Sequence, residues 1–194
     1  MKIFLVRHGA HSELGKVLSG RSQISLDAEG ERQISRLAEQ LADKGIARIE
    51  TSPRPRTRRT ADIIARRLGV EVEVADALDE IDFGEWTGKS YSALDADPRW
   101  HRWNDMRAAA ATPGGEDMNA VAERIGRHLE ELARTDGAPV LCVSHGDVIK
   151  AGIARYLGLS LDHLLRFDVD PASVSVIEAG PWGGRLTLLN GGAP

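Results

Sequence analysis

The feature that most constrains the fold is the regular exchange of short strand-like runs with longer segments of helical periodicity. Strand-like runs occupy 3–6, 46–51, 70–74 and 139–143, and two later ones occupy 173–178 and 185–190. Apolar residues recur at helical spacing in 27–44, 55–68, 117–133 and 147–157. Because strands that alternate with helices are typical of α/β proteins, we expect a three-layer α/β/α fold with a largely parallel central sheet.

The chain length and one irregular segment set the expected domain organisation. With 194 residues, the chain is predicted to form a single domain over 1–194. The stretch 76–115 has little long-range periodicity, with short helices expected near Tyr91 and Trp100, and residues 88–115 are predicted to form a capping segment. Trp86, Trp100 and Trp103 fall in or near it. We interpret them first as a small subsidiary core and second as a wall against a substrate.

Composition narrows the class of protein. The net charge is −4, and 42% of the residues are hydrophobic, as in an ordinary globular domain. No apolar run reaches the roughly 18 residues of a membrane span. The chain starts directly in a strand with no secretory leader pattern, so we expect a cytoplasmic protein that binds no membrane. The acidic balance and the lack of a nucleic-acid motif predict no nucleic-acid partner.

The ends of the predicted strands carry the polar side chains with the most chemistry. Arg7-His8-Gly9 follows the first strand, and Ser144-His145-Gly146 follows the strand at 139–143. Arg56 comes shortly after the second strand, and Glu80 follows the third. Ligands of α/β sheets bind beyond the carboxyl ends of the strands. We therefore expect two histidines, at least two arginines and a carboxylate at one edge.

The basic segment 52–68 points to an anion. It contains six arginines and one aspartate. Arg66 and Arg67 are explained by a solvated helix face. A second group crowds the start of the helix, where the helix dipole disfavours cations unless an anion is bound: Arg54, Arg56, Arg58 and Arg59. A bound phosphate would remove this conflict.

Histidines, arginines and a carboxylate around an anion suit phosphoryl transfer through a histidine nucleophile. His8 would attack phosphorus as a neutral imidazole. Arg7 and Arg56 would bind the phosphoryl oxygens as planar forks, and His145 would donate a further hydrogen bond. Glu80 would protonate the leaving oxygen and later deprotonate water.

Other histidines and the single cysteine have simpler interpretations. A metal site built from His8, His11 and His145 is the alternative, but the flanking arginines would repel a cation, so no metal and no cofactor are expected at the reacting site. Cys142 is interpreted as a buried small hydrophobe, with a catalytic thiol as the alternative. His101, His128 and His163 are assigned surface or structural roles.

Several segments occur in an order that resembles one family. They are Leu5-Val-Arg-His-Gly9, Gly20 with Leu26-Asp-Ala-Glu-Gly30, Thr51-Ser-Pro-Arg-Pro-Arg56 with Thr60-Ala61, Leu78-Asp-Glu80 with Gly84-Glu-Trp86 and Gly88, Pro113-Gly-Gly-Glu116, and Ser144-His-Gly146. Together they resemble the histidine phosphatase superfamily, in the branch that includes cofactor-dependent phosphoglycerate mutase and α-ribazole phosphatase. The resemblance implies a phosphoglycerate mutase-like fold and runs through nearly the whole chain.

The resemblance also implies residue roles. It makes His8 the phosphorylated nucleophile, places the phosphate pocket at Arg7, Arg56 and His145, and makes Glu80 the proton donor. The Gly115-Glu116 pair would belong to a substrate-side loop. His11 and Leu14 stand where the family often has Thr and Asn, so a missing phosphate contact would be supplied by His11, Ser12 or Arg21. Asp117 replaces the usual Ser, which suggests a different helix cap.

The function expected from these residues is a metal-independent phosphatase of the histidine acid type. It would hydrolyse a small phosphorylated metabolite through a phosphohistidine, as a monomer or homodimer. Three alternatives remain: a cofactor-dependent phosphoglycerate mutase, a non-catalytic phospho-ligand binding module, and a protein phosphohistidine phosphatase.

Overall fold

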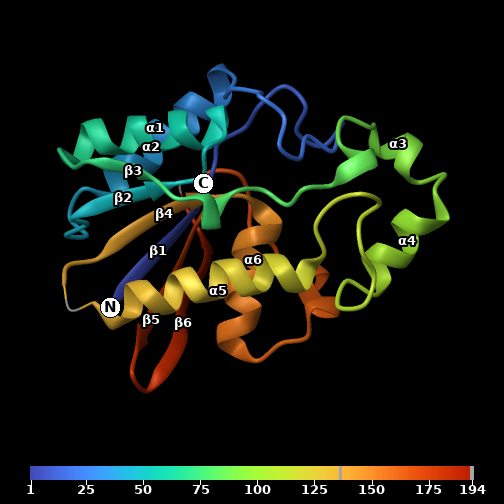
Figure 1. Ribbon diagram of the computed structural model, residues 1–194. Helices are drawn as coiled ribbons and strands as arrows, with labels where there is room; N and C mark the ends of the chain where they lie inside the picture. The colour runs from blue at the N-terminus through green and yellow to red at the C-terminus, as the bar shows by residue number, and fades with distance from the viewer. Residues whose placement is uncertain (136, 193–194) are drawn as a thin grey trace.

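The computed structural model describes residues 1–135 and 137–192, and a six-stranded sheet lies at its centre (Figure 1). The strands are β1 (Lys2–Arg7), β2 (Arg48–Thr51), β3 (Val72–Val74), β4 (Val140–Ser144), β5 (Val174–Gly180) and β6 (Gly183–Gly191). Their order across the sheet is β3-β2-β4-β1-β5-β6. The first and fourth strands of the chain are therefore neighbours at the centre of the sheet.

The directions of the strands make this sheet mixed. β1 pairs in parallel with β4, and β2 pairs in parallel with both β4 and β3. β5 runs antiparallel to β1, and β6 runs antiparallel to β5. The expected α/β fold is confirmed, and β5 is the strand that departs from the parallel arrangement. The short connection between β5 and β6 explains their pairing, since a tight turn joins antiparallel strands whereas a parallel pair needs a long crossover.

Helices cover both faces of the sheet (Figure 1). α1 (Ala28–Leu41) and α2 (Pro55–Leu68) lie on one face, and α5 (Met118–Arg134) and α6 (Gly146–Leu157) lie on the other. Successive side chains of a strand point to opposite faces. In β1, Ile3 and Leu5 accordingly join the core on the α5 and α6 side, while Phe4 and Val6 join the core under α1 and α2. In β4, Cys142 faces the α5 side.

The helix ends follow the local sequence signals. Asp27 caps α1 by accepting a hydrogen bond from the Gly30 amide, and the helix ends at Leu41, three residues earlier than expected. Pro55 occupies the first turn of α2, and Gly69 ends it in the left-handed conformation, as expected. Asp117 caps α5 through the Ala120 amide. Within 1–135 and 137–192, no helix is both long and apolar enough to cross a membrane.

The segment between β3 and α5 extends away from the sheet (Figure 1). It contains the short helices α3 (Tyr91–Leu94) and α4 (Pro98–Asp105), close to the positions expected from the sequence. Trp86 and Trp103 are fully buried. Their rings pack edge to face at 6.0 Å, and Trp100 stacks on Trp103 at 5.3 Å. The first interpretation of these tryptophans, a subsidiary core, therefore describes Trp86 and Trp103.

Candidate active site

The two histidines of the candidate site are brought together by one pair of adjacent strands. β1 and β4 pair so that Arg7 lies opposite Ser144, and the His8 amide donates to the Ser144 carbonyl at 3.2 Å. The rings of His8 and His145 lie 5.2 Å apart, nearly edge to face. His145 directly precedes α6, so the positive end of that helix also faces this site. The strand-end prediction thus placed both imidazoles correctly in space.

His8 is held in one protonation state and one tautomer. Its Nδ1 lies 2.8 Å from the Gly9 carbonyl, which can only accept, so Nδ1 carries the proton and Nε2 keeps its lone pair. Burial, followed by the charges of Arg56 and Arg7, holds the pKa of His8 well below its usual range. His8 is therefore a neutral imidazole whose nucleophilic nitrogen faces the Arg56 guanidinium, with Arg56 Nε 3.3 Å away.

Two guanidinium groups are fixed around His8 by backbone carbonyls. Arg56, in the first turn of α2, is 1% exposed and donates from Nη2 to the Gly20 carbonyl at 2.7 Å. The same Nη2 lies 3.1 Å from His145 Nδ1. Arg7 donates from Nη1 to the Val169 carbonyl at 2.7 Å. Its Nε is buried and has no hydrogen-bond partner among the described residues.

Glu80 is the carboxyl group closest to these bases. Its Oε2 lies 3.5 Å from His145 Nδ1 and 3.8 Å from Arg56 Nη2, and its Oε1 accepts from the Ile81 amide at 3.0 Å. Burial raises the pKa of Glu80 to about 7, with Asp147 adding to the increase and Arg56 opposing it. Glu80 therefore carries a proton at slightly acidic pH and can donate it.

A hydrogen-bonded chain behind His145 was not predicted from the sequence. Ser52 Oγ lies 2.8 Å from His145 Nε2 and 3.2 Å from Asp79 Oδ1. Asp79 also accepts from the Glu80 amide at 2.8 Å and from Arg54 at 2.9 and 3.0 Å. Asp79 thus supports His145 and Glu80 together. Asp79 directly precedes Glu80 in the sequence, and Ser52 lies in the same Thr51–Arg56 segment as Arg56, which was the available signal.

The same contacts show which arginines of the basic segment belong to the site. Arg54 is neutralised by Asp79, and Arg59 pairs with Glu31 at 2.7 Å. Arg58 is exposed. The crowding of cations at the start of α2 is therefore relieved partly by carboxylates, and Arg56 alone of this group points into the cavity.

A cavity of about 350 Å³ opens above these groups. Arg7, His8, Arg56 and Glu80 line its base. Its wall includes apolar and aromatic side chains, namely Leu14, Val17, Leu18, Phe83, Tyr91, Trp100 and Leu165. Its rim carries two ion pairs, Arg107 with Asp147 at 2.8 Å and Lys150 with Asp168 at 3.7 Å. Trp100 thus stacks on Trp103 and is also part of the cavity wall.

The remaining predicted contact residues separate into two groups. His11 lines the cavity, and its ring lies 5.3 Å from that of His8. Burial, followed by the charge of Arg56, lowers the pKa of His11 to about 4, so His11 is neutral. Its Nδ1 is buried without a hydrogen-bond partner in the described part of the chain. Leu14, at the second departing position, also lines the cavity.

The second group lies outside the cavity lining, which differs from the expectation. Ser12 is exposed. Arg21 donates to the Glu80 carbonyl at 2.8 Å and to Glu116 at 2.9 Å, so these two side chains brace the Glu80 loop instead of pointing into the cavity. Gly115 packs against that loop so tightly that a Cβ would lie 2.2 Å from the Asp82 carbonyl oxygen. Sequence spacing could not distinguish a residue that lines the cavity from a residue that only supports the loop lining it.

Close backbone approach explains the glycine after His8. A Cβ at Gly9 would lie 2.7 Å from the Gly30 carbonyl oxygen, in the first turn of α1. A Cβ at Gly30 would lie 2.1 Å from the Ala10 carbonyl oxygen. The His8 loop and the start of α1 therefore fit together only with glycine at both positions.

Solved structures of several phosphatases share this fold. The mycobacterial glucosyl-3-phosphoglycerate phosphatase Rv2419c is similar with a TM-score of 0.87 and 25% identity, over 98% of each chain. The α-ribazole phosphatase from Shigella flexneri gives 0.87 and 25% over 100% of each chain. A phosphoserine phosphatase mutant from Entamoeba histolytica, in complex with phosphoserine, gives 0.88 and 25% over 97% of this chain and 96% of that one. The fold is thus that of phosphoglycerate mutase-like phosphatases.

The chain belongs to the histidine phosphatase superfamily (branch 1), whose sequence profile matches residues 3–191. The "Bifunctional protein Rv2228c" of Mycobacterium tuberculosis is 36% identical over 182 residues, which is 91% of this chain and 50% of that protein. The chain therefore spans about half the length of the first curated relatives it matches. A "Probable phosphoglycerate mutase GpmB" of Serratia proteamaculans is 32% identical over 190 residues, 94% of this chain and 87% of that protein. The expected family resemblance is confirmed.

Proposed function

We propose that this protein is a metal-independent phosphomonoester hydrolase that acts on a small phosphorylated metabolite through a phosphohistidine at His8. The observation that carries the proposal is the state of His8: a neutral, buried imidazole whose unprotonated Nε2 lies 3.3 Å from Arg56 Nε. A cation surrounded by arginines would be repelled, whereas a phosphoryl group would be attracted. Arg7 also lines the cavity and offers such a group a second guanidinium.

In the first half of the reaction, His8 Nε2 attacks phosphorus and the bond from phosphorus to the alcohol oxygen breaks. Arg7 and Arg56 stabilise the charge on the transferring oxygens, and their carbonyl contacts hold them in place before substrate binds. The protonated Glu80 gives its proton to the leaving alcohol. The products of this step are the free alcohol, phosphohistidine and the Glu80 carboxylate.

In the second half, a water molecule attacks the phosphohistidine. The Glu80 carboxylate takes a proton from that water, the bond from phosphorus to His8 breaks, and inorganic phosphate leaves. Glu80 and His8 return to their initial states. Because burial brings the pKa of Glu80 to about 7, this carboxyl group can serve in both directions near neutral pH.

Residues 88–115 are proposed to act as a cap that limits the size of the alcohol. Four of their side chains line the cavity, namely Tyr91, Trp100, Asn104 and Arg107. The segment is tied to the opposite wall by a hydrogen bond from the Leu18 amide to the Lys89 carbonyl at 2.9 Å. A cavity of about 350 Å³ suits a small metabolite. Asn104 and the charged rim suit an alcohol that carries polar groups.

A phosphoglycerate mutase is the second candidate, favoured by the likeness to the GpmB protein. The two functions differ in what accepts the phosphoryl group, water or a second hydroxyl of the substrate. Hydrolysis is supported by the phosphatases among the structural relatives. A binding module without turnover is the third candidate, and the complete set of His8, His145 and Glu80 is evidence against it.

The experiment that separates these functions follows products in the presence of EDTA. The protein is incubated with 3-phosphoglycerate and a catalytic amount of 2,3-bisphosphoglycerate, and in parallel with a panel of phosphomonoesters. We expect phosphate release from at least one phosphomonoester, with EDTA having no effect, because the side chains alone supply the charge and the protons. Rapid isomer exchange with negligible phosphate release would identify a mutase instead. Complete loss in EDTA that zinc or magnesium restores would contradict the metal-independent mechanism.

Replacing Glu80 by Gln should slow hydrolysis according to the leaving group. For an alkyl phosphomonoester we expect kcat/KM to fall about 10²–10⁴-fold, since protonation of the alcohol is lost. An activated aryl phosphate needs little protonation and should lose far less. Stopped assays on both substrates, with the wild type as reference, measure the ratio. Equal losses on the two substrates would remove Glu80 from the role of acid.

The pH dependence of kcat/KM provides a second test of Glu80 as the proton donor. Because burial raises the pKa of Glu80 to about 7, Glu80 is protonated in the free protein below that pH and ionised above it. For the alkyl substrate, kcat/KM of the wild type should therefore decline as pH rises through about 7. The decline should be absent in Glu80→Gln.

A further inference from the structure

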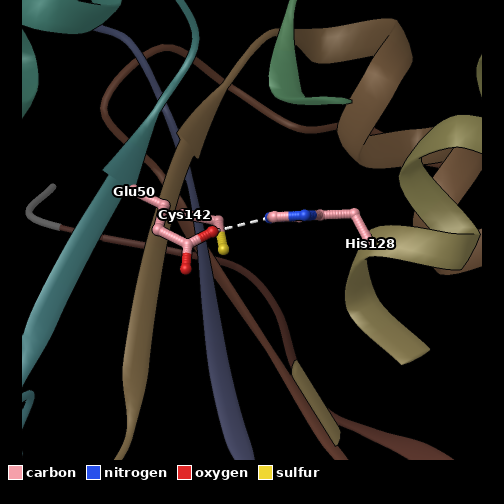
Figure 2. A group of neighbouring side chains, drawn as sticks. All are labelled: Glu50, His128 and Cys142. Carbon is pink, nitrogen blue, oxygen red and sulfur yellow. Dashed lines mark ion pairs between the residues drawn. The ribbon is translucent and has the colours of Figure 1, made fainter. Parts of the chain in front are cut away.

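A second cluster of reactive side chains lies inside the molecule, away from the cavity (Figure 2). Glu50 of β2 and Cys142 of β4 are paired directly across the sheet, and His128 points toward them from α5. One ligand-type atom from each residue lies within 4.8 Å of the other two. Among residues 1–135 and 137–192, this is the one set of three His, Cys, Asp or Glu side chains with that property.

The polar atoms of this cluster do not satisfy one another. Glu50 is 6% exposed, and its Oε2 lies 2.7 Å from His128 Nε2. Despite this separation, neither atom has a hydrogen-bond partner of acceptable geometry in the described structure. Buried polar atoms are almost always hydrogen-bonded, because an unpaired one costs free energy. The two atoms form an ion pair without a well-aligned hydrogen bond, and they converge beside a thiol, so they are placed to share a cation.

We propose that Glu50, His128 and Cys142 bind a divalent cation of the zinc type, with water in the fourth position. The donor set is one imidazole nitrogen, one carboxylate oxygen and one thiolate sulfur, all of which are zinc ligands. Tetrahedral coordination would need the nitrogen and oxygen about 3.4 Å apart and the nitrogen and sulfur about 3.6 Å apart. Side-chain shifts of about 1 Å reach these separations from the present 2.7 Å and from distances within 4.8 Å.

The charges of the cluster suit such an ion. The Glu50 carboxylate and the Cys142 thiolate together would neutralise a doubly charged cation in a buried place. Arg48 Nε donates to the other oxygen of Glu50 at 3.2 Å, which orients the carboxylate from outside. The Cys142 thiol would give up its proton on metal binding.

A surface depression lies between α5 and the turn at Asp76–Leu78, and His128 borders it. Two arginines of its lining, Arg124 and Arg127, are balanced by the carboxylates of Asp76 and Glu131, so the lining carries no excess of positive charge. The His128 side chain is 17% exposed, whereas Cys142 is fully buried. An ion would therefore enter past His128. This histidine, to which we assigned a surface or structural role from the sequence, would then act as a metal ligand.

Once bound, the ion would join α5 to two central strands. Both strands lead directly to the candidate active site, since Ser52 lies two residues beyond Glu50 and His145 three beyond Cys142. The role inferred is structural: the ion would stabilise the packing of α5 on β2 and β4. It takes no part in the proposed hydrolysis, so each proposal can fail without the other.

Cobalt titration tests this site directly. Reduced protein is stripped with EDTA, transferred to chelator-free buffer and titrated with Co²⁺. We expect one equivalent to produce the charge-transfer absorption of a thiolate bound to cobalt, together with the visible bands of tetrahedral Co²⁺, and one equivalent of Zn²⁺ to remove both. Cys142 is the only cysteine of the chain, so the charge-transfer band reports this cluster and not the histidines of the cavity.

Variants and thermal stability complete the test. Loss of groups that merely orient metal ligands costs about 10–100-fold in affinity, so His128→Gln should weaken Co²⁺ binding by about 100-fold or more. Cys142→Ala should abolish the charge-transfer band, and His163→Gln, on a different element, should behave as wild type. Zn²⁺ should raise the Tm of the wild type and of His163→Gln only.

Two results would overturn the proposal. One is a wild-type protein that gives no charge-transfer band and no Tm shift with excess Zn²⁺, which would leave Glu50 and His128 as an ordinary ion pair. The other is a His128→Gln variant, folded by circular dichroism, that binds Co²⁺ as tightly as the wild type. The wild-type measurement decides the first point even if a variant does not fold.

Discussion

Replacing His8 by Ala abolishes phosphoryl transfer, by about 10⁴-fold or more in kcat, if His8 forms the covalent intermediate. The physical reason is that the variant loses the imidazole nitrogen that lies beside Arg56 at the base of the cavity. His145 is fully buried and is not among the residues that line the cavity, so its nitrogens cannot take over. Rapid quench with a phosphate-labelled substrate should trap a label in the wild type that is labile in acid and stable in alkali.

His101→Ala is the matched control, because His101 is an exposed histidine outside the cavity lining. This variant should be labelled as the wild type is. Label that persists in His8→Ala would assign the nucleophile to another residue. A wild type that turns over without any trapped label, even when an aryl phosphate makes the second step rate-limiting, would point to direct attack by water.

Arg56→Ala should also have a large effect, a loss of about 10²–10³-fold in kcat. Arg56 is fully buried, and its guanidinium is already aligned by the Gly20 carbonyl, so it meets the phosphoryl oxygens without reorganisation. Arg56→Lys keeps the charge but loses the planar fork, and we expect an intermediate loss. Steady-state kinetics on one phosphomonoester measure the series.

Arg66→Ala provides the control within the same helix. Arg66 is exposed in the last turn of α2 and should change kcat by less than about twofold. Thermal unfolding of each variant separates catalysis from stability, since removing Arg56 also leaves the Gly20 carbonyl without its partner. An Arg56→Ala protein with nearly wild-type kcat would exclude the proposed charge stabilisation.

Much of the fold and the base of the cavity followed from patterns within short segments. Strand and helix periodicity placed Arg7, His8 and His145 at strand ends, and parallel neighbours bring such ends to one edge. The family resemblance distinguished Arg56, as a phosphate ligand, from the other arginines of the segment 52–68. The antiparallel β5 was not predicted, because periodicity reports that a strand exists and not its direction.

The parts that escaped prediction depend on partners distant in the chain. Ser52, Asp79 and His145 come from three segments, and their hydrogen bonds require the actual register and rotamers. The same holds for Arg21 and Glu116, which were expected to face substrate and instead bind each other. Cys142 and Glu50 meet only because β2 and β4 pair in one register, which the sequence alone does not specify.

The central pairing of β1 with β4 also determines when activity can arise during folding. These strands come from opposite ends of the chain, yet their register alone sets His8 beside His145. Closing so long a loop is slow compared with forming the local helices. A folding intermediate that holds α1, α2 and the β5–β6 hairpin but lacks this contact would have much of the native helix content and no catalytic power. If the proposed activity is correct, turnover should therefore not recover before β1 and β4 have paired, even where a signal from the helices has already returned.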